Sequence, residues 1–378
     1  MSKYHSNEIP SPCFVLETKS FKRNLELIKR VSKQAEVEII LAFKGFSMWS
    51  AFPLLKGYVS GATASSLSEL KLCMEEMKTK AHTYFVAYRE EEIDEVLAGS
   101  SHITFNSLSQ FEKFSGKIQQ NSEQVKCGIR VNPEYSEVAT DLYNPSASFS
   151  RLGVTRASMP EQLPEGITGL HFHVLCESDS FALENTLHAF ETQFEPYLKQ
   201  VSWVNLGGGH LLTRKGYDID HLVQVLRDFK EKHKVELIME PGSAFGWQAG
   251  NLVTTVMDIV ENGGVKTAII DASFTCHMPD CLEMPYKPTV LGNDDSGPFN
   301  YHLGGLSCLA GDFIPDFQFN HPLSIGDRIV FEDMMHYTMV KTTTFNGIQH
   351  PSIGIIGANG KFRLVREFGY EDFKSRLS

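Results

Sequence analysis

The sequence predicts an α/β protein, a parallel (β/α)8 barrel with a second, C-terminal β-barrel-like domain. Strand-like apolar runs alternate with amphipathic helical patterns over about 210 residues, and eight such runs fit a closed barrel better than an open sheet. After Gly250 the pattern changes to short β-rich runs separated by Gly, Pro and Asp clusters. We therefore expect the barrel in residues 23–245 and the β domain in 246–378. Residues 1–22 should supply an N-terminal strand to the β domain and the start of a helix.

The barrel strands are predicted at short apolar runs rich in β-branched residues. A helix over 20–31 precedes the first strand, and later helices begin after Ser180 and Asp218, where apolar residues recur at helical spacing. The expected barrel strands are 37–43, 57–63, 83–88, 102–106, 125–132, 166–174, 203–207 and 235–240. The expected strands of the second domain are 252–260, 267–271, 328–331 and 337–341.

The composition is that of an ordinary globular protein. Of the 378 residues, 42% are hydrophobic and 21% are charged, and 35 basic against 46 acidic residues give a net charge of −11. This charge argues against nucleic acid or an anionic membrane as partner and is compatible with a cationic substrate. No segment resembles a signal peptide or a membrane span. Seven scattered cysteines predict a reduced, cytoplasmic protein.

Lys44 lies where the first predicted barrel strand ends, in the stretch LAFKGF (41–46). A lysine is rarely buried without a partner. Desolvation would lower the pKa of its amine and make it a better nucleophile towards a carbonyl carbon. The alternative is a lysine that reaches solvent from the strand end, and this stretch taken alone favours that alternative.

Other polar or glycine-rich features follow three of the later strands. Three glycines end the stretch NLGGG (205–209), where their amides could approach an anion or could merely form a tight turn. Glu240 ends the eighth strand as a cap, a core acid or a functional group. His171 and His173 share one strand face, where they could pack in the core or bind a metal, although no convincing third ligand is evident. The C-terminal ends of barrel strands form one rim, so these groups should meet Lys44 there.

This combination meets the needs of pyridoxal phosphate. A lysine can form the Schiff base, glycine amides can hold the phosphate, and an imidazole can stack on the ring. A carboxylate can keep the pyridine nitrogen protonated, so that the ring acts as an electron sink. No metal is expected, because Cys276, His277 and Cys281 also depart from zinc spacing.

A fixed order of motifs extends these observations over nearly the whole chain. The motifs are AFK (42–44), the strand of His173, GGG (207–209), EPG (240–242), DAS (271–273), GLSC (305–308) with Asp312, and Tyr337 ahead of FNG (345–347). Their order resembles that of the alanine-racemase-fold (fold type III) pyridoxal phosphate decarboxylases, which include ornithine and diaminopimelate decarboxylases. The stretches HFHVLCE (171–177), EPGSAF (240–245) and HMPDCLEMPY (277–286) resemble the carboxynorspermidine/carboxyspermidine decarboxylases in particular.

The resemblance implies an activity, an assembly and roles for the cofactor-binding residues. The activity is decarboxylation of carboxynorspermidine or carboxyspermidine to norspermidine or spermidine in polyamine biosynthesis, by a homodimer with shared active sites. Lys44 would be the Schiff-base lysine, His173 the imidazole that stacks on the ring, and Glu240 the partner of the pyridine nitrogen. The phosphate would be held by Gly207, Gly208 and Gly209, with help from Ser243 and Tyr337.

The resemblance also implies how the substrate is handled. Cys308 would reach the active site from the other subunit and donate a proton to the α-carbon. The distal amine of the substrate would meet the acidic residues Asp271, Asp280, Glu283 and Asp312. We therefore expect Asp312→Ala to weaken substrate binding and Lys44→Ala to abolish turnover.

Three departures from the wider family bear on these assignments. Leu175 and Cys176 stand where Gly-Ser is usual, and Ser243 stands where Arg usually follows Glu-Pro-Gly, so Ser243 or Arg151 would have to compensate at the phosphate. Leu309 replaces the Glu that follows the cysteine in diaminopimelate decarboxylases, which favours a purely cationic distal group. The alternatives are a decarboxylase of another basic amino acid, such as diaminopimelate or ornithine, and a decarboxylase-like binding protein without catalysis.

Overall fold

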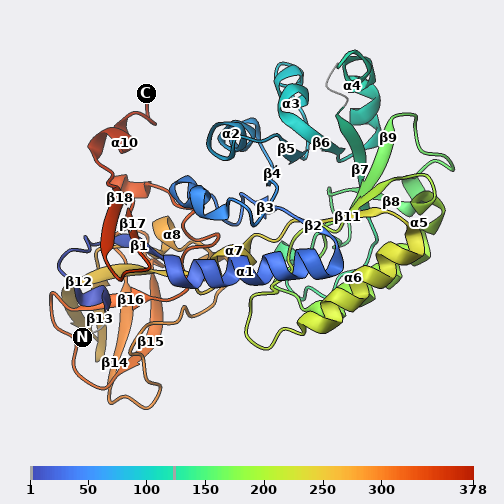
Figure 1. Cartoon of the computed structure of the whole chain (residues 1–378). Coiled ribbons are helices and arrows are strands. Elements are labelled where there is room, and N and C mark those ends of the chain that lie inside the picture. Colours follow the sequence, from blue (N-terminus) through green and yellow to red (C-terminus); the bar gives the residue numbers. More distant parts are fainter. Residues whose placement is uncertain (1–2, 122–124) are drawn as a thin grey trace. The chain divides into compact units, whose positions relative to one another are not determined.

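The computed structural model describes residues 3–121 and 125–378, and the chain divides into two compact units. The barrel unit is Asn24–Phe245, and the sheet unit combines the N-terminal residues up to Arg23 with Gly246–Ser378. Figure 1 shows the elements of both units. In the described residues no helix is both long enough and apolar enough to cross a membrane.

The barrel unit contains a ring of parallel strands. Its order is β2-β11-β10-β9-β7-β6-β5-β4-β3, and only Ile40 separates β2 from β3, so the ring closes through one continuous segment. The strands are β2 (Glu38–Ile39), β3 (Leu41–Ala42), β4 (Ala62–Ala64), β5 (Ala81–Tyr84), β6 (Ser100–Phe105), β7 (Lys126–Asn132), β9 (Ile167–His171), β10 (Trp203–Asn205) and β11 (Glu236–Met239), with the short β8 (Val154–Thr155) beside β7. The predicted barrel is confirmed.

Amphipathic helices alternate with these strands. They are α1 (Thr18–Ala35), α2 (Leu67–Leu72), α3 (Ile93–Gly99), α4 (Leu108–Gln120), α5 (Ser180–Leu198), α6 (Ile219–His233) and α7 (Ser243–Gly246), with the short helices η2 (Trp49–Leu55), η3 (Cys73–Met77), η4 (Asp141–Tyr143) and η5 (Arg156–Ser158). Asp179 and Asp218 cap the first turns of α5 and α6, because each carboxylate accepts hydrogen bonds from backbone N–H groups there. The buried faces of the two helices meet at Phe190 and Phe229, whose ring centroids are 6.3 Å apart.

The expected strand over 83–88 is only partly a strand. The chain leaves the sheet after Tyr84, although Phe85 and Tyr88 stay buried. The Tyr88 hydroxyl lies 3.2 Å from the backbone N of Phe85 and 2.9 Å from the backbone O of Thr104, and it supplies partners that a ladder would otherwise provide. Apolar residues in this stretch therefore mark a buried loop as well as a strand.

The sheet unit is a mixed sheet in the order β15-β14-β13-β12-β1-β17-β18, with β16 paired to β12. Its strands are β1 (Cys13–Glu17), β12 (Gly250–Asn262), β13 (Val265–Ile270), β14 (Phe299–Gly304), β15 (Phe313–Phe319), β16 (Arg328–Phe331), β17 (Ser352–Ile356) and β18 (Phe362–Arg366). Its short helices are η1 (Lys3–His5), α8 (Phe274–His277), α9 (Asp280–Glu283), η6 (Phe345–Gly347) and α10 (Tyr370–Lys374). A second, β-rich unit is confirmed.

The predicted strand over 337–341 is wrong. Tyr337 has a φ of 48°, in the left-handed region, and its carbonyl oxygen accepts hydrogen bonds from the backbone N of Val340 and of Lys341, each at 2.9 Å. These bonds close a turn, so the β-branched and aromatic residues of this stretch do not enter the sheet.

Candidate active site at the C-terminal ends of the barrel strands

Lys44 and His173 face each other inside the barrel unit. Lys44 follows β3, His173 follows β9, and Lys44 Nζ lies 3.3 Å from His173 Nε2. The Gly208 N–H donates to His173 Nδ1 at 2.9 Å, so the hydrogen of a neutral ring is assigned to Nε2. An ammonium has no lone pair to accept that hydrogen, whereas a neutral amine has one. This hydrogen-bond geometry favours a neutral, nucleophilic Lys44.

The electrostatic surroundings act in the same direction. Burial lowers the pKa of Lys44, and the nearby charge of Arg130 lowers it further against the opposing effect of Glu240. Burial also lowers the pKa of His173 well below its ordinary value, with Lys44 and Arg130 adding to the effect. Burial therefore favours the neutral form of both groups, which is the form that a nucleophile and its neighbouring imidazole require.

Glu240 lies directly after β11 with its carboxylate almost completely buried. Asn205 Nδ2 donates to Glu240 Oε1 at 2.6 Å, and His171 Nε2 lies 4.0 Å from Glu240 Oε2. Burial raises the pKa of Glu240, while the Asn205 hydrogen bond and the charge of Lys44 oppose that rise. A buried carboxylate in this balance is suited to sharing a proton with a basic ring nitrogen.

Arg130, in β7, is a buried cation that the sequence argument did not identify. Its guanidinium lies 4.7 Å from the centre of the Tyr84 ring and donates to the carbonyl oxygen of His173 at 3.0 Å. These contacts fix the backbone at the end of β9 beside the imidazole. An arginine between the apolar residues Ile129 and Val131 of a strand is rarely buried without a role, so position 130 carried a signal that could have been used.

Asn205 was likewise not identified as a site residue. It ends β10, donates to Glu240 and accepts the backbone N–H of Gly207 at 2.9 Å. One amide therefore orients both the carboxylate and the glycine turn. The signal was its position at a strand end, directly before the motif LGGG (206–209).

The glycine turn is required by close packing. A Cβ at Gly208 would lie 2.5 Å from the backbone O of Glu240, and a Cβ at Gly209 would lie 2.1 Å from the backbone O of Leu175. Gly209 also has a φ of +87°, which L side chains rarely adopt. Only glycine lets these strand ends approach so closely, whether or not an anion binds.

The amides of the same turn are already partly used. Gly207 N–H donates to Asn205 Oδ1 and Gly208 N–H donates to His173 Nδ1, both at 2.9 Å. Within the described residues, the N–H of Gly209, unlike those of Gly207 and Gly208, has no side-chain acceptor. An anion at this turn would therefore meet Gly209 first.

The turn that follows Glu240 packs against the turn of Lys44. A Cβ at Gly45 would lie 2.6 Å from the Gly242 Cα and 3.2 Å from the Ser243 backbone N. Ser243 thus lies beside the lysine turn, while Arg151 adds positive charge near the Tyr84 hydroxyl. Their roles at a phosphate stay predictions.

His171, His173 and Glu240 also bring three metal-ligating atoms within 4.8 Å of one another. The third ligand that sequence reasoning could not find is therefore Glu240. However, a neutral imidazole that coordinates through Nε2 carries its hydrogen on Nδ1, where the Gly208 N–H already donates to His173. The present hydrogen bonds favour an organic cofactor over a metal at this position.

The predicted substrate-binding acids lie in the sheet unit, and each has a partner there. Asp271 Oδ1 accepts the backbone N–H of Thr255 at 2.8 Å. Lys341 Nζ contacts Asp280 Oδ1 closely and lies 3.0 Å from Glu283 Oε2. Asp312 is buried and accepts three hydrogen bonds, from Ser273 Oγ, Thr275 N and Ser307 N.

Cys308 and Tyr337, also in the sheet unit, differ in their surroundings. Cys308 is exposed, and its backbone N–H donates to Asn346 Oδ1 at 2.8 Å. Tyr337 lies in the turn described above, with its ring edge-on to His336 at 6.4 Å. The roles predicted for both residues stay predictions.

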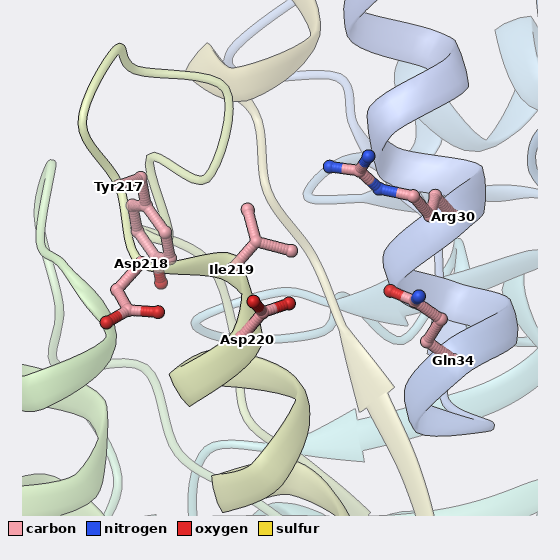
Figure 2. A pocket seen from close by; sticks show the side chains of 6 residues that line it. All are labelled: Arg30, Gln34, Tyr217, Asp218, Ile219 and Asp220. Carbon is pink, nitrogen blue, oxygen red and sulfur yellow. The ribbon is translucent and has the colours of Figure 1, made fainter.

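A separate polar cleft lies on the outside of the barrel unit, between α1 and the start of α6. Its volume is about 410 Å³, and Figure 2 shows its lining residues Arg30, Gln34, Tyr217, Asp218, Ile219 and Asp220. None of the predicted site residues lines it. The chemistry described above does not depend on this cleft.

Residues 13–335 match the family described as "Pyridoxal-dependent decarboxylase, C-terminal sheet domain". This chain belongs to the pyridoxal-dependent decarboxylases. It is 51% identical over 374 residues to the carboxyaminopropylagmatine decarboxylase of Synechocystis sp., covering 98% of this chain and 96% of the relative. It is 41% identical over 382 residues to the carboxynorspermidine/carboxyspermidine decarboxylase of Campylobacter jejuni, covering 98% and 99%.

Solved structures of pyridoxal-dependent decarboxylases share the fold. The crystal structure of carboxynorspermidine decarboxylase complexed with norspermidine from Campylobacter jejuni has a TM-score of 0.90 at 40% identity and covers 97% of this chain and 100% of that chain. A diaminopimelate decarboxylase from Helicobacter pylori complexed with L-lysine has a TM-score of 0.82 at 17% identity, covering 97% and 96%, and supports the fold alone.

The residues of this decarboxylase fit its cofactor, pyridoxal phosphate. An amine whose pKa is lowered by burial, a buried carboxylate and an imidazole lie close together, and both ring nitrogens of the buried His171 have no hydrogen-bond partner within the described part of the chain. Unpaired buried polar atoms of this kind indicate a place where a polar group binds. The donor set therefore suits a ring with a carbonyl and a basic nitrogen.

Proposed function

We propose that this decarboxylase removes the α-carboxylate of carboxynorspermidine or carboxyspermidine to give norspermidine or spermidine. The observation that carries the proposal is the full-length similarity to the Campylobacter jejuni enzyme of that name, together with the pairing of Lys44 and His173. Three of the predicted substrate acids, Asp271, Asp280 and Glu283, fit a cationic substrate.

Pyridoxal phosphate, when bound, supplies a carbonyl and a ring that accepts the electrons released from the bond to carbon dioxide. In this proposal Lys44 would attach the cofactor through Nζ, and Glu240, oriented by Asn205, would hold a proton at the pyridine nitrogen. His173 would lie against the ring. Gly209, with Ser243 and Tyr337, would hold the phosphate. Gly207 and Gly208, whose N–H groups donate to Asn205 and His173, would shape the turn beside the phosphate.

Cys308 would return a proton to the α-carbon after carbon dioxide leaves, as the family resemblance implies. A thiol can do so because it loses and regains its proton near neutral pH more readily than a hydroxyl. Its exposure in the isolated chain agrees with an active site completed by a second copy.

A second candidate substrate is carboxyaminopropylagmatine. The higher identity, 51% against 41%, favours this candidate. Its agmatine part ends in a planar guanidinium, whereas the other two substrates end in an ammonium. A guanidinium can bind a carboxylate through two parallel hydrogen bonds, so the two classes should differ in how they use Asp280 and Glu283.

We also propose a cytoplasmic homodimer. Four apolar side chains around Cys308 are more than 40% exposed, namely Leu306, Leu309, Phe313 and Phe345. Apolar surface of this kind usually marks a protein interface. In the described residues no cysteine forms a disulfide, which agrees with a reducing compartment.

Carbon dioxide release from the purified protein tests the function. The panel contains carboxynorspermidine, carboxyspermidine, carboxyaminopropylagmatine, ornithine and diaminopimelate, compared by kcat/KM. Turnover with ornithine or diaminopimelate alone would reject the polyamine assignment. Borohydride reduction followed by peptide mapping should place the cofactor on Lys44, and Lys44→Ala should be inactive. Sedimentation of the wild-type protein tests the dimer.

A further inference from the structure

We propose that Asp312 and Asn346 are positioning residues that fix Cys308, and that Asp312 does not bind the substrate's distal amine. The inference rests on the proposed function only for the role of Cys308 as proton donor. It reverses the expectation drawn from the family resemblance, which made Asp312 a substrate ligand.

Asp312 is the centre of a hydrogen-bond network that holds the loop carrying Cys308. Its Oδ2 accepts from Ser273 Oγ at 2.9 Å and from Ser307 N at 3.0 Å, and its Oδ1 accepts from Thr275 N at 3.0 Å. The Gly305 N–H donates to the Asp312 backbone O at 2.7 Å. One side chain thus closes the loop 305–312 on itself and ties it to residues 273–275.

Space around the carboxylate is limited as well. Asp312 is 4% exposed, and a Cβ at Gly305 would lie 2.4 Å from Asp312 Oδ2. A carboxylate has about four lone-pair sites, and three of them are already used. A substrate ammonium would have to enter a packed site and compete with these donors, which is unfavourable compared with an exposed acid.

Asn346 holds Cys308 from a second direction. Its Oδ1 accepts the Cys308 backbone N–H at 2.8 Å, and its φ of 59° is a left-handed conformation that asparagine tolerates better than most residues. The neighbouring Cys276 Sγ contacts the Phe345 backbone O at 3.6 Å and anchors the turn. Cys308 therefore has a fixed backbone although its thiol is exposed.

The two anchors together give the exposed thiol a defined position. A proton donor must lie within about 3 Å of the carbon that it protonates, and a displacement of about 1 Å can cost on the order of 100-fold in rate. Loss of either anchor should therefore lower kcat and leave KM nearly unchanged. A substrate-binding residue would behave in the opposite way.

A matched pair at position 346 tests the first anchor. Asn346→Gly keeps the left-handed backbone and removes the acceptor, whereas Asn346→Asp keeps an acceptor oxygen. We expect Asn346→Gly to lower kcat by about 100-fold and Asn346→Asp to recover most of it. In both variants KM for the polyamine substrate should stay close to that of the wild type.

Hydrogen exchange provides a readout that does not depend on activity. In Asp312→Asn, the amide of Ser307 or that of Thr275 should exchange faster, because asparagine keeps only one of the two oxygens that accept these N–H groups. In Asn346→Gly the Cys308 amide should do the same. Peptides of β17 should not change. The matched control is Asp316→Asn, since that exposed carboxylate accepts only a long 3.4 Å bond from Asn300.

The outcomes separate the inference from the proposed function. Faster exchange with a lower kcat supports positioning. A raised KM in Asp312→Asn with unchanged exchange would make Asp312 a substrate ligand and overturn the inference. If the wild type releases no carbon dioxide from any polyamine, the function fails, while the exchange data still decide whether Asp312 and Asn346 fix the loop.

Discussion

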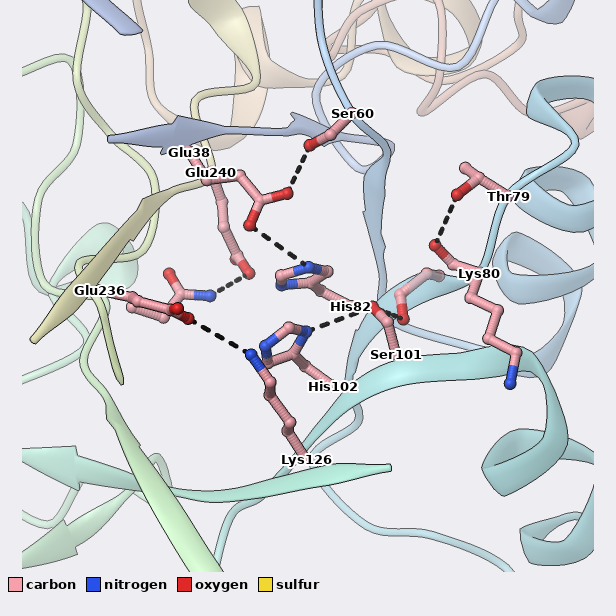
Figure 3. Close-up of polar contacts among 12 residues, drawn as sticks. Glu38, Ser60, Thr79, Lys80, His82, Ser101, His102, Lys126, Glu236 and Glu240 are labelled. Atoms are coloured by element: carbon pink, nitrogen blue, oxygen red, sulfur yellow. Dashed lines mark hydrogen bonds and ion pairs between the residues drawn. The ribbon is translucent and has the colours of Figure 1, made fainter. Parts of the chain in front are cut away.

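A stacked pair of histidines in the barrel unit should make the protein acid-sensitive. His82 in β5 and His102 in β6 are both more than 90% buried, and their ring centroids lie 4.0 Å apart (Figure 3). Both lie near the N-terminal ends of their strands. Burial lowers the pKa of each imidazole from 6.5 to about 3, with the facing charge of Lys126 adding to the effect.

The magnitude follows from proton linkage. The folded pKa lies below the unfolded pKa, so only the unfolded chain takes up these protons as the pH falls below about 6.5, and stability is lost down to about pH 3. At pH 5, which is 1.5 units below the unfolded pKa, protonation stabilises the unfolded state by about 1.36 kcal/mol per unit, or about 2 kcal/mol for each imidazole. The result at pH 5 depends on the unfolded pKa alone, because both folded rings stay neutral there. Two rings give about 4 kcal/mol.

Urea unfolding at pH 7 and pH 5 measures this loss. The fluorescence of the fully buried Trp203 can report it, since the indole lies edge-on to His102 at 5.1 Å. The double variant His82→Gln/His102→Gln should lose about 4 kcal/mol less than the wild type between the two pH values. His188→Gln, at an exposed histidine, is the control and should behave as the wild type. An unchanged pH dependence in the double variant would refute the reasoning.

Three further predictions concern the site. Asn205→Ala should weaken cofactor binding by about 10- to 100-fold in a titration, because a hydrogen bond to a charged group contributes about 1.5–3 kcal/mol. The control Asn185→Ala, which loses a surface hydrogen bond to Glu137, should bind the cofactor normally. Gly208→Ala should lower stability by about 1–3 kcal/mol and disturb cofactor binding, whereas Gly116→Ala, with open space in a helix, should stabilise by about 0.5–1 kcal/mol in urea unfolding. Lys341→Met should lower KM for the polyamine about two- to fivefold, because the substrate would no longer have to replace a surface ion pair worth about 0.2–1 kcal/mol. An unchanged or raised KM would contradict a substrate role for Asp280 and Glu283.

The barrel could be predicted because its strands are short, apolar and separated by amphipathic helices. The errors occurred where tertiary contacts replaced the local pattern. Phe85 and Tyr88 lie in a buried loop, where the Tyr88 hydroxyl accepts the Phe85 N–H in place of a neighbouring strand. Tyr337 takes a left-handed backbone conformation that its β-propensity does not predict. In the sheet unit, neither β14 nor β15 was expected. Pro315 and Asp316 interrupt the apolar pattern of β15.

The site could be predicted in its reactive groups and not in its supporting groups. Lys44, His173 and Glu240 were identifiable because each ends a strand on the same rim. Arg130 and Asn205 carried a local signal, but their roles could not be assigned, since these depend on which atoms they meet across neighbouring strands. The direction of the hydrogen bonds at His173 could not be predicted from the sequence either, and this direction favours a neutral Lys44.

The acids of the sheet unit show why net charge alone is a weak guide to substrate affinity. A cationic substrate can reach Asp280 and Glu283 only by replacing Lys341, so the electrostatic part of its binding free energy is a difference between two ion pairs. Such a difference is small compared with either pair. Discrimination between an ammonium and a guanidinium would then depend on geometry, because a planar group can bind one carboxylate twice while Lys341 makes single contacts to two. The ratio of kcat/KM between the two substrate classes, measured in the wild type and in Lys341→Met, should therefore change even where the total affinity changes little.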